Sequence, residues 1–350
     1  MKLNLLFLTM ILSSTLFNIT DSAATKNDNI SSKEAESAPT LPYSCQCVAF
    51  RLDDVQDYFL VQAQMEIIKT FEKKNASLTI GIIGNLIGND TVLVNFLREK
   101  IAEGSNNEND SNSFVLEVAN HGWKHEDFTL LNEEEQSLLM QKTNEKIFDI
   151  LDVKPNVFIP PFNRLNNDTI TALSQNQMSY ISANTTFYPP SSLINDSQNR
   201  SADDNNGMTG TSPSSELIFH FPSLATTGDI NADYTEWFGN PHNIVFADMN
   251  ESMNRLGYAV VTMHPQEHSI RNGFEYDGGF DSRQIQELEL LIDDIRAAGF
   301  RIVTISQINQ GNGTSIPEFS SYSIHTILAV SILMIIWLST RGTKGIQKFR

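Results

Sequence analysis

Two carboxylates, Asp53 and Asp54, follow directly after a short apolar run in the segment CVAFRLDDVQDYF, residues 47–59. In an extended chain, neighbouring side chains point to opposite faces. Two adjacent acids at the end of a buried strand therefore have two interpretations. They open a turn and cap the helix that follows, or they belong to a functional site and divide two tasks between them.

Three histidines offer donors of another kind. His121 and His125 are four residues apart in EVANHGWKHEDF, and His264 follows the apolar run YAVVTM. In a helical turn, residues four apart lie on one face, so His121 and His125 are suited to clamp a metal. Two imidazoles and one carboxylate hold zinc or a similar divalent ion and leave positions open for water. Because a metal-bound carboxylate cannot readily act as a free base, two adjacent acids suit separate roles.

Short apolar runs alternate with helical patterns along most of the chain. The runs predict strands over 48–52, 78–83, 114–118, 157–159, 180–182, 258–263 and 301–305. Helices are predicted over 61–74, 91–102, 133–151, 169–175, 244–256 and 282–298. This alternation predicts a parallel sheet, open or closed into a barrel. Functional residues of such sheets gather at the carboxyl ends of the strands, where the acids and histidines above stand.

The segments FRLDD, HGWKH, PPFN and TMHP resemble, in order and spacing, the motifs of the NodB-type polysaccharide deacetylases. That family consists of metal-dependent carbohydrate esterases. The resemblance covers residues 45–310 and implies an α/β fold, a distorted (β/α) barrel of about seven parallel strands. The paired acids and the His-x-x-x-His motif are its most specific parts, and the last two motifs are looser.

The resemblance also implies a role for each matched residue. The metal ligands would be Asp54, His121 and His125. The ion would be Zn²⁺, with Co²⁺ as the alternative. Asp53 would take a proton from a metal-activated water, the backbone N–H of Phe162 would help to hold the oxyanion, and His264 would protonate the departing amine. The implied reaction is hydrolysis of an N-acetyl group on a glycan.

Three positions depart from the family's pattern. The family has an arginine that positions the base where this chain has Ile159, so either Arg164 takes its place or the base is tuned differently. An aspartate–tryptophan motif is matched only loosely, by Asp233 and Trp237. The last motif has leucine where this chain has Thr262. The tuning of the base and the substrate pocket are therefore less defined than the metal site.

Other residues keep two interpretations. His268 is either a partner of the site or an exposed loop residue, and Trp123 either stacks on a sugar or packs beside the metal loop. Cys45 and Cys47 have one residue between them, which makes a disulfide strained though feasible. They lie at the start of the first predicted strand, away from the functional edge, and we assign them no chemistry.

Composition limits the partners and the domain count. The chain of 350 residues has 42 acidic and 24 basic side chains and a net charge of −18, which argues against nucleic acid as a partner. We expect a polar linker over 25–42 and one catalytic domain over 43–310. Within it, residues 184–216 are rich in Asn, Ser and Asp and are predicted to be a surface insertion.

The two ends of the chain predict a membrane protein. Residues 1–24 have the layout of a secretory signal peptide, with an uncleaved anchor as the alternative. Residues 322–340 are predicted to be a transmembrane helix, with a buried core helix as the alternative. The tail 341–350 is basic, which favours a cytoplasmic tail and an extracellular domain. Many Asn-X-Ser/Thr sequences are compatible with a glycoprotein.

We therefore predict a membrane-anchored, extracellular, metal-dependent hydrolase that acts on the linear amide bond of an N-acetylated glycan. One alternative is a hydrolase of the same fold that acts on a non-sugar amide, which the missing arginine favours. Another is a non-catalytic, cell-surface glycan-binding protein that keeps the metal for structure. The presence of both Asp53 and His264 argues against this last alternative.

Overall fold

The structure is a computed structural model that describes residues 45–105, 113–184, 218–231, 236–272 and 275–309. The predicted segments 1–24, 25–42, 322–340 and 341–350 lie outside these ranges, as do all but the first residue of 184–216. Within the described ranges, no helix is long and apolar enough to cross a membrane. The predicted membrane span is not among the residues to which this finding applies.

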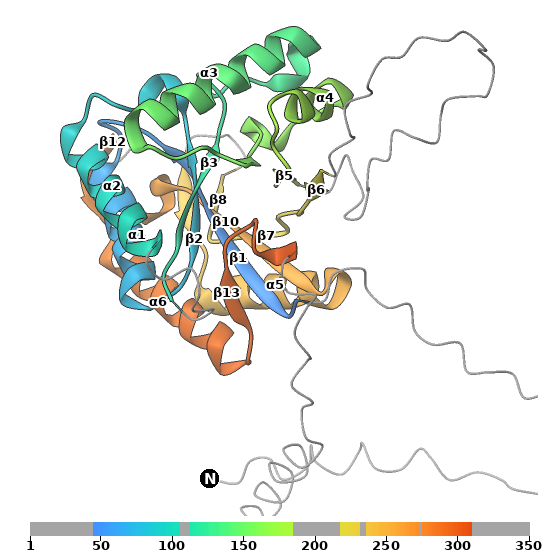
Figure 1. Ribbon diagram of the computed structural model, residues 1–350. Coiled ribbons are helices and arrows are strands. Elements are labelled where there is room, and N and C mark those ends of the chain that lie inside the picture. The colour runs from blue at the N-terminus through green and yellow to red at the C-terminus, as the bar shows by residue number, and fades with distance from the viewer. Residues whose placement is uncertain (1–44, 106–112, 185–217, 232–235, 273–274, 310–350) are drawn as a thin grey trace, which may run out of the picture. The chain divides into compact units, whose positions relative to one another are not determined.

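A nine-stranded parallel sheet forms the centre of the fold and curls into an incomplete barrel (Figure 1). Its strands are β1 (Cys47–Val55), β2 (Leu78–Ile82), β3 (Leu116–Asn120), β4 (Val157–Phe158), β5 (Tyr180–Ile181), β6 (Phe219–His220), β7 (Ala225–Thr226), β10 (Tyr258–Met263) and β13 (Arg301–Val303). Their order is β6-β5-β4-β3-β2-β1-β10-β7, and β13 pairs with the first residues of β1. The predicted fold class is confirmed. The strand number exceeds seven because the two-residue strands β6 and β7 were not predicted from the sequence.

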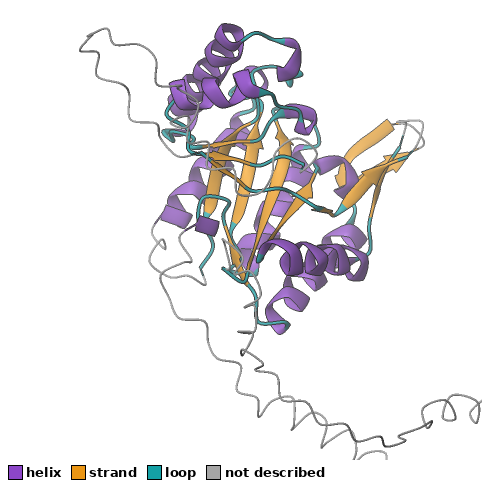
Figure 2. Cartoon of the chain, turned by 90° about the vertical axis from the view of Figure 1, so that its right-hand side faces the viewer, coloured by secondary structure: helices purple, strands orange, loops and turns teal. Residues whose placement is uncertain are grey.

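Helices lie outside the strands of this sheet (Figure 2). They are α1 (Val61–Lys73), α2 (Thr91–Ser105), α3 (Glu133–Leu151), α4 (Asn167–Gln175), α5 (His242–Leu256) and α6 (Ser282–Ala297). Each corresponds to a helix predicted from the sequence. The start of α3 shows why such a helix begins where it does, because Asn132 and Glu135 form a reciprocal capping box.

Further elements join the strands to the helices. They are the 3-10 turns η1 (Gly84–Leu86), η2 (Phe128–Leu130), η3 (Pro161–Asn163) and η4 (Pro265–His268), and the hairpins β8 (Gly228–Ile230)–β9 (Trp237–Gly239) and β11 (Ser269–Asn272)–β12 (Glu275–Phe280). Both hairpins are antiparallel. The sequence patterns did not predict them.

The residues of β1 alternate between two cores. Those that pack on the helix side are Val48, Phe50 and Leu52. Cys47 and Ala49 belong to a second cluster, inside the curled sheet. Because side chains of a strand alternate with a period of two, Arg51 and Asp53 continue this inner side. The acid at the end of the strand therefore faces the interior of the barrel.

The carboxyl end of β1 is irregular. Its register with β2 shifts between Leu52 and Val55, and Asp54 has a φ of 62°. Strict alternation would send Asp53 and Asp54 to opposite faces of the sheet. The irregularity turns the backbone between them, as a β-bulge does, so both carboxylates reach the same edge.

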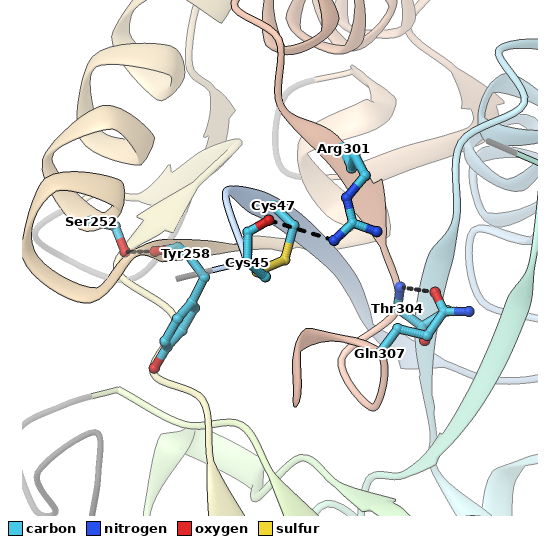
Figure 3. The surroundings of a disulfide bond; sticks show 7 residues. All are labelled: Cys45, Cys47, Ser252, Tyr258, Arg301, Thr304 and Gln307. Carbon is cyan, nitrogen blue, oxygen red and sulfur yellow. Dashed lines mark hydrogen bonds between the residues drawn. A yellow bond between two sulfur atoms is a disulfide. The ribbon is translucent and has the colours of Figure 1, made fainter. Parts of the chain in front are cut away.

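The opposite end of the barrel interior carries the two cysteines. Cys45 and Cys47 are joined in a disulfide at the amino end of β1, beside Tyr258 and Arg301 (Figure 3). The guanidinium of Arg301 lies 3.5 Å from the carbonyl oxygen of Cys45. Since Asp53 stands at the other end of the same strand, the disulfide takes no part in the candidate site.

Candidate active site

The three predicted metal ligands converge. Oδ1 of Asp54 lies 3.3 Å from Nε2 of His121 and 3.3 Å from Nε2 of His125. The potential ligand atoms of the three residues lie within 4.8 Å of one another. Ligands bonded to one tetrahedral zinc ion at about 2.1 Å are roughly 3.4 Å apart. The donor set and its spacing therefore fit a divalent metal.

The two histidines do not meet on a helical turn, so that prediction is wrong. Residues 121–125 form a loop after β3, in which Gly122 and His125 have φ values of 76° and 63°. The backbone N–H of Trp123 donates to the carboxylate of Glu126 at 3.1 Å. Because local side chains satisfy its backbone amides, the loop needs no helix to bring both imidazoles to one point.

The orientation of the His121 ring follows from a contact with the third motif. Its Nδ1 lies 2.7 Å from the carbonyl oxygen of Ile159, and the residue is buried. Nδ1 donates to this carbonyl, and Nε2 faces Asp54, to which the protonated ring donates a hydrogen bond; without its proton, Nε2 would present its lone pair to a metal. This is the arrangement in which a metal-ligating histidine is usually held. Ile159 thus serves the site through its backbone.

The three groups shift one another's proton affinity. Burial alone would raise the pKa of Asp54, but its hydrogen bond with His121 and the nearby histidine charges hold that pKa well below its usual range. Burial would lower the pKa of His121, and the hydrogen bond with Asp54 outweighs it and raises this pKa. Desolvation and the charge of His121 lower the pKa of His125. A positive charge is therefore favoured between Asp54 and His121, where a metal would supply it.

Asp53 stands beside this cluster, and in the described part of the chain it forms no ion pair with His121 or His125. The residue is 3% exposed, and its Oδ2 lies 3.1 Å from Nη2 of Arg51. Nε2 of His264 lies 4.0 Å from the same oxygen. Arg164 does not replace the family's arginine, because its guanidinium pairs with Asp127 at 2.6 Å. The guanidinium at the predicted base belongs to Arg51, which the sequence did not single out.

His264 is held by a carboxylate that sequence reasoning missed. Oε1 of Glu267 accepts the backbone N–H of His264 at 3.1 Å, and Oε2 lies 3.7 Å from its Nδ1. The side chain of Glu267 is fully buried. Burial would lower the pKa of His264, but Glu267, followed by Asp53 and Asp54, raises it. The spacing of an acid three residues after a histidine in a Pro-led turn was the available signal.

Two residues around His264 settle earlier alternatives. The ring of Trp237 lies 4.6 Å from the ring of His264, centroid to centroid, so the tryptophan of the loose motif does reach the site. Asp233 of the same motif lies outside the described residues. His268 is 2% exposed and 3.8 Å from Glu267, which rules out the exposed-loop interpretation.

Aromatic residues border the metal loop. Phe162 is 58% exposed, and its ring centroid lies 4.5 Å from that of His125. Trp123 has the ammonium of Lys142 from α3 over its ring at 4.0 Å. This contact supports the packing role for Trp123. Phe162 instead leaves an apolar surface open at the mouth of the site.

Backbone conformations that L-residues seldom adopt collect at this edge. The non-glycine residues with positive φ include Asp54, His125, Phe162 and Asn163. Each such conformation costs of order 1–3 kcal/mol and persists only where surrounding contacts enforce it. Four of them stand at the converging ends of β1, β3 and β4, which supports the choice of this edge as the candidate site.

Residues 41–181 match the family model described as polysaccharide deacetylase. The resemblance deduced from the motifs is confirmed. The match covers less than half of the chain and includes both acids, the His-x-x-x-His motif and Phe162. His264 lies beyond the matched polysaccharide deacetylase region, so its place at the site rests on the structure.

Several solved structures are similar to the chain. A Xyl-CE4 domain of a multidomain xylanase from the hindgut metagenome of Trinervitermes trinervoides has 15% identity and a TM-score of 0.45, over 77% of this chain and 92% of that one. A family 4 acetyl xylan esterase from Clostridium thermocellum in complex with a cobalt ion has 13% identity and a TM-score of 0.48, over 77% and 93%. A CE4 family pseudoenzyme from Bacillus anthracis has 14% identity and a TM-score of 0.45, over 75% and 65%.

These likenesses are too distant to add to the polysaccharide deacetylase match, because their TM-scores stay below 0.5. No curated protein matches the chain.

Proposed function

We propose that this chain is a metal-dependent hydrolase that removes N-acetyl groups from an extracellular glycan. The observation that supports it is the convergence of Asp54, His121 and His125 beside Asp53 and His264. A metal needed only for structure requires neither of the last two residues. Their presence next to the ligand cluster favours catalysis.

Asp54, His121 and His125 would hold the ion. A divalent ion such as Zn²⁺ or Co²⁺ supplies Lewis-acid chemistry, because it acidifies a water and polarises a carbonyl oxygen. The donor set fits both ions.

The chain's own groups perform the proton transfers. Asp53 accepts a proton from the water that attacks the acetyl carbonyl. The backbone N–H of Phe162 donates a hydrogen bond to the oxygen on which negative charge develops. His264 gives a proton to the sugar nitrogen as the C–N bond breaks. The products are acetate and an amine. Because Asp53 Oδ2 and His264 Nε2 lie 4.0 Å apart, base and acid serve the same small group of reacting atoms.

The test compares acetate release from N-acetylglucosamine oligomers by the full chain and its variants. We expect Asp53→Asn and His264→Ala to lose activity by roughly 10²- to 10⁴-fold, the usual contribution of a general base or acid, while metal content stays unchanged. The matched controls are Asp149→Asn, an exposed acid on α3, and His242→Ala on α5, which should keep full activity. Full activity in either site variant contradicts the mechanism.

Metal analysis tests the ligands separately. Replacing His121 and His125 together by alanine should remove the bound metal from the full chain. A variant that keeps its metal would show that the ligands lie elsewhere.

The acetate-release assay distinguishes the two rival functions. Acetate release from non-sugar amides alone indicates another amide substrate, and sugar binding without acetate release indicates a glycan-binding protein.

We also propose that the catalytic domain is extracellular and anchored by residues 322–340. The apolar character of that segment and the basic tail after it support the proposal. Protease added to intact cells should then degrade the catalytic domain and spare an epitope placed after residue 350. Protection of the catalytic domain in intact cells contradicts this location.

A further inference from the structure

A fully buried arginine, Arg51, lies on the inner side of the barrel next to Asp53. Its Nε donates to Oγ1 of Thr262 at 2.9 Å, its Nη1 to the carbonyl oxygen of Ser182 at 2.5 Å, and its Nη2 to Oδ1 of Asn163 at 2.6 Å. A buried charge is costly unless it is paired and hydrogen-bonded. Three neutral acceptors on three other segments thus hold the guanidinium in place.

The positive charge of Arg51 is balanced by a carboxylate on the same strand, β1. Among the described residues, Asp53 is the one carboxylate that forms an ion pair with Arg51, at 3.1 Å from Nη2 to Oδ2. Burial lowers the pKa of Arg51 and the charge of Asp53 opposes this effect. The two residues are separated by one position on β1 and face the same side, so β1 itself sets their spacing.

The two oxygens of Asp53 have different surroundings. Oδ2 is held by Arg51, whereas Oδ1 is buried and has no hydrogen-bond partner within the described part of the chain. A carboxylate with one oxygen anchored can turn the other toward only one place. Oδ1 is therefore the oxygen suited to accept a proton from a reacting water.

We propose that Arg51 is the positioning residue of the catalytic base, which fixes the Asp53 carboxylate with Oδ1 toward the reaction site. This inference rests on the proposed function. Arg51 acts through Asp53 and touches no reacting atom. It takes, from β1, the role that the resemblance assigns to an arginine at position 159.

The side chain of Ile159 ends near the β2 residue that lies opposite the Asp53–Asp54 segment. The pairs Leu52↔Ile80 and Val55↔Ile82 place Asp53 beside Gly81 on β2. A Cβ on Gly81 would lie 3.3 Å from Cδ1 of Ile159. The side chain of Ile159 thus ends at the glycine next to Asp53. An arginine at 159 would begin close to the segment that carries Asp53, so moving the guanidinium to this position can be tested experimentally.

The first test replaces Arg51 in the full chain. Arg51→Met keeps an unbranched but shorter side chain and removes the guanidinium with its charge, and we expect kcat on N-acetylglucosamine oligomers to fall roughly 10²-fold, in the range of general-base effects. KM and metal content should stay unchanged. Arg51→Lys keeps the positive charge but has a single donor group, and its kcat should fall less than that of Arg51→Met. If Arg51→Met does not fold, the kcat of Arg51→Lys decides, and a wild-type kcat in that variant overturns the proposal.

A variant that moves the arginine from position 51 to position 159 distinguishes a positioning role of Arg51 from a purely structural one. The double variant Arg51→Thr with Ile159→Arg should have a kcat at least about tenfold higher than that of Arg51→Thr alone. A tenfold gain is a fraction of the usual contribution of a general base. The matched control is Thr79→Val, which removes a partly buried 2.7 Å hydrogen bond to Glu117 inside the same barrel. It should lower Tm without changing kcat. If Arg51→Met behaves like Thr79→Val, with lower Tm and unchanged kcat, Arg51 is only a structural brace.

A measurement that does not depend on catalytic activity tests the role of Arg51 separately from the proposed function. In crystal structures, the Asp53 carboxylate should turn in Arg51→Met relative to the wild type and keep its orientation in Thr79→Val. An unchanged Asp53 in Arg51→Met overturns the positioning role even if the enzyme is active. Absence of acetate release by the wild type contradicts the proposed function, and the orientation of Asp53 still decides the role of Arg51.

Discussion

At the scale of single residues, the site consists of two charge pairs beside a ligand cluster. Arg51 pairs with Asp53, and Glu267 pairs with His264. Each partner is close in sequence to the residue it holds, within one strand or one turn. The proposed acid, His264, and the proposed base, Asp53, therefore keep their orientation through local backbone geometry, which costs little additional ordering on folding.

The Glu267–His264 pair predicts a change in pH dependence. Glu267 raises the pKa of His264, so the protonated acid persists to a higher pH than it would without this partner. In Glu267→Gln, the alkaline limb of the kcat profile should move to lower pH, because His264 loses its proton earlier. Measured kcat values against pH provide the check.

A second histidine–glutamate pair supplies the control for this change. His242 Nδ1 lies 2.6 Å from Oε2 of Glu287, on the helices α5 and α6. Glu287→Gln should leave the alkaline limb where it is. An unshifted limb in Glu267→Gln, or an equal shift in both variants, would refute the role assigned to Glu267.

At the scale of elements, the β8–β9 hairpin and the turn η4 must pack closely to hold Glu267. A Cβ at Gly228 would overlap with Oε2 of Glu267 and lie 2.6 Å from the carbonyl oxygen of Phe238. Gly228→Ala should therefore displace Glu267 or open the hairpin. Overpacking of this kind lowers the free energy of unfolding by about 1–3 kcal/mol. Because Glu267 contacts His264, kcat should also fall.

Thermal unfolding and kcat of Gly228→Ala provide the measurement. Gly279→Ala is the comparison, since the nearest atom to its Cβ belongs to the exposed side chain of Asp277, at 3.1 Å. Equal Tm and kcat in both variants would show that the space at Gly228 is not needed.

A half-buried acid on β3, Glu117, predicts how the stability of the sheet depends on pH. Removal from water raises the pKa of Glu117 above its ordinary value of 4.5, although Ser306 and Thr79 donate hydrogen bonds to it. The folded chain thus binds this proton more tightly than the unfolded chain. The stabilisation is complete below the ordinary pKa and is lost as pH rises through the raised one.

Glu117→Gln should lack this loss of stability. Unfolding temperatures of both proteins, measured from about pH 4 to pH 8, should converge at low pH and separate as pH rises, with the wild type lower. Tyr180, whose pKa Glu117 raises further above 10.0, titrates outside this range. Parallel curves for the two proteins would contradict the assignment.

At the scale of the whole molecule, metal binding should be linked to folding. The ligands come from β1 and from the loop after β3, which meet only in the folded chain. An ion that binds only the folded state adds about 2.7 kcal/mol of stability at a concentration 100 times its Kd. Added Zn²⁺ should therefore raise Tm, and a chelator should reverse the rise.

The double variant His121→Ala with His125→Ala provides the control for this linkage. Its Tm should not respond to Zn²⁺. A similar rise in Tm for the wild type and the double variant would mean that the ion stabilises the protein from another site.

Much of the framework could be predicted from periodicity. The bounds of α3 and β10 agree with the predicted ranges 133–151 and 258–263, because long apolar patterns are strong local signals. The β8–β9 and β11–β12 hairpins escaped prediction since their partly exposed strands carry weak patterns. The 121–125 loop was mistaken for a helical turn because four-residue spacing does not distinguish the two.

By itself, the sequence determined the parallel α/β arrangement, the order of the motifs and the candidate roles of Asp53, Asp54, His121, His125 and His264. These follow from residue type and spacing, which are local properties. Only the tertiary structure decided that both acids reach one edge and that Arg51 and Glu267 lie against Asp53 and His264. Such pairings depend on a backbone irregularity and on close packing between separate strands and turns. No linear pattern encodes contacts of that kind.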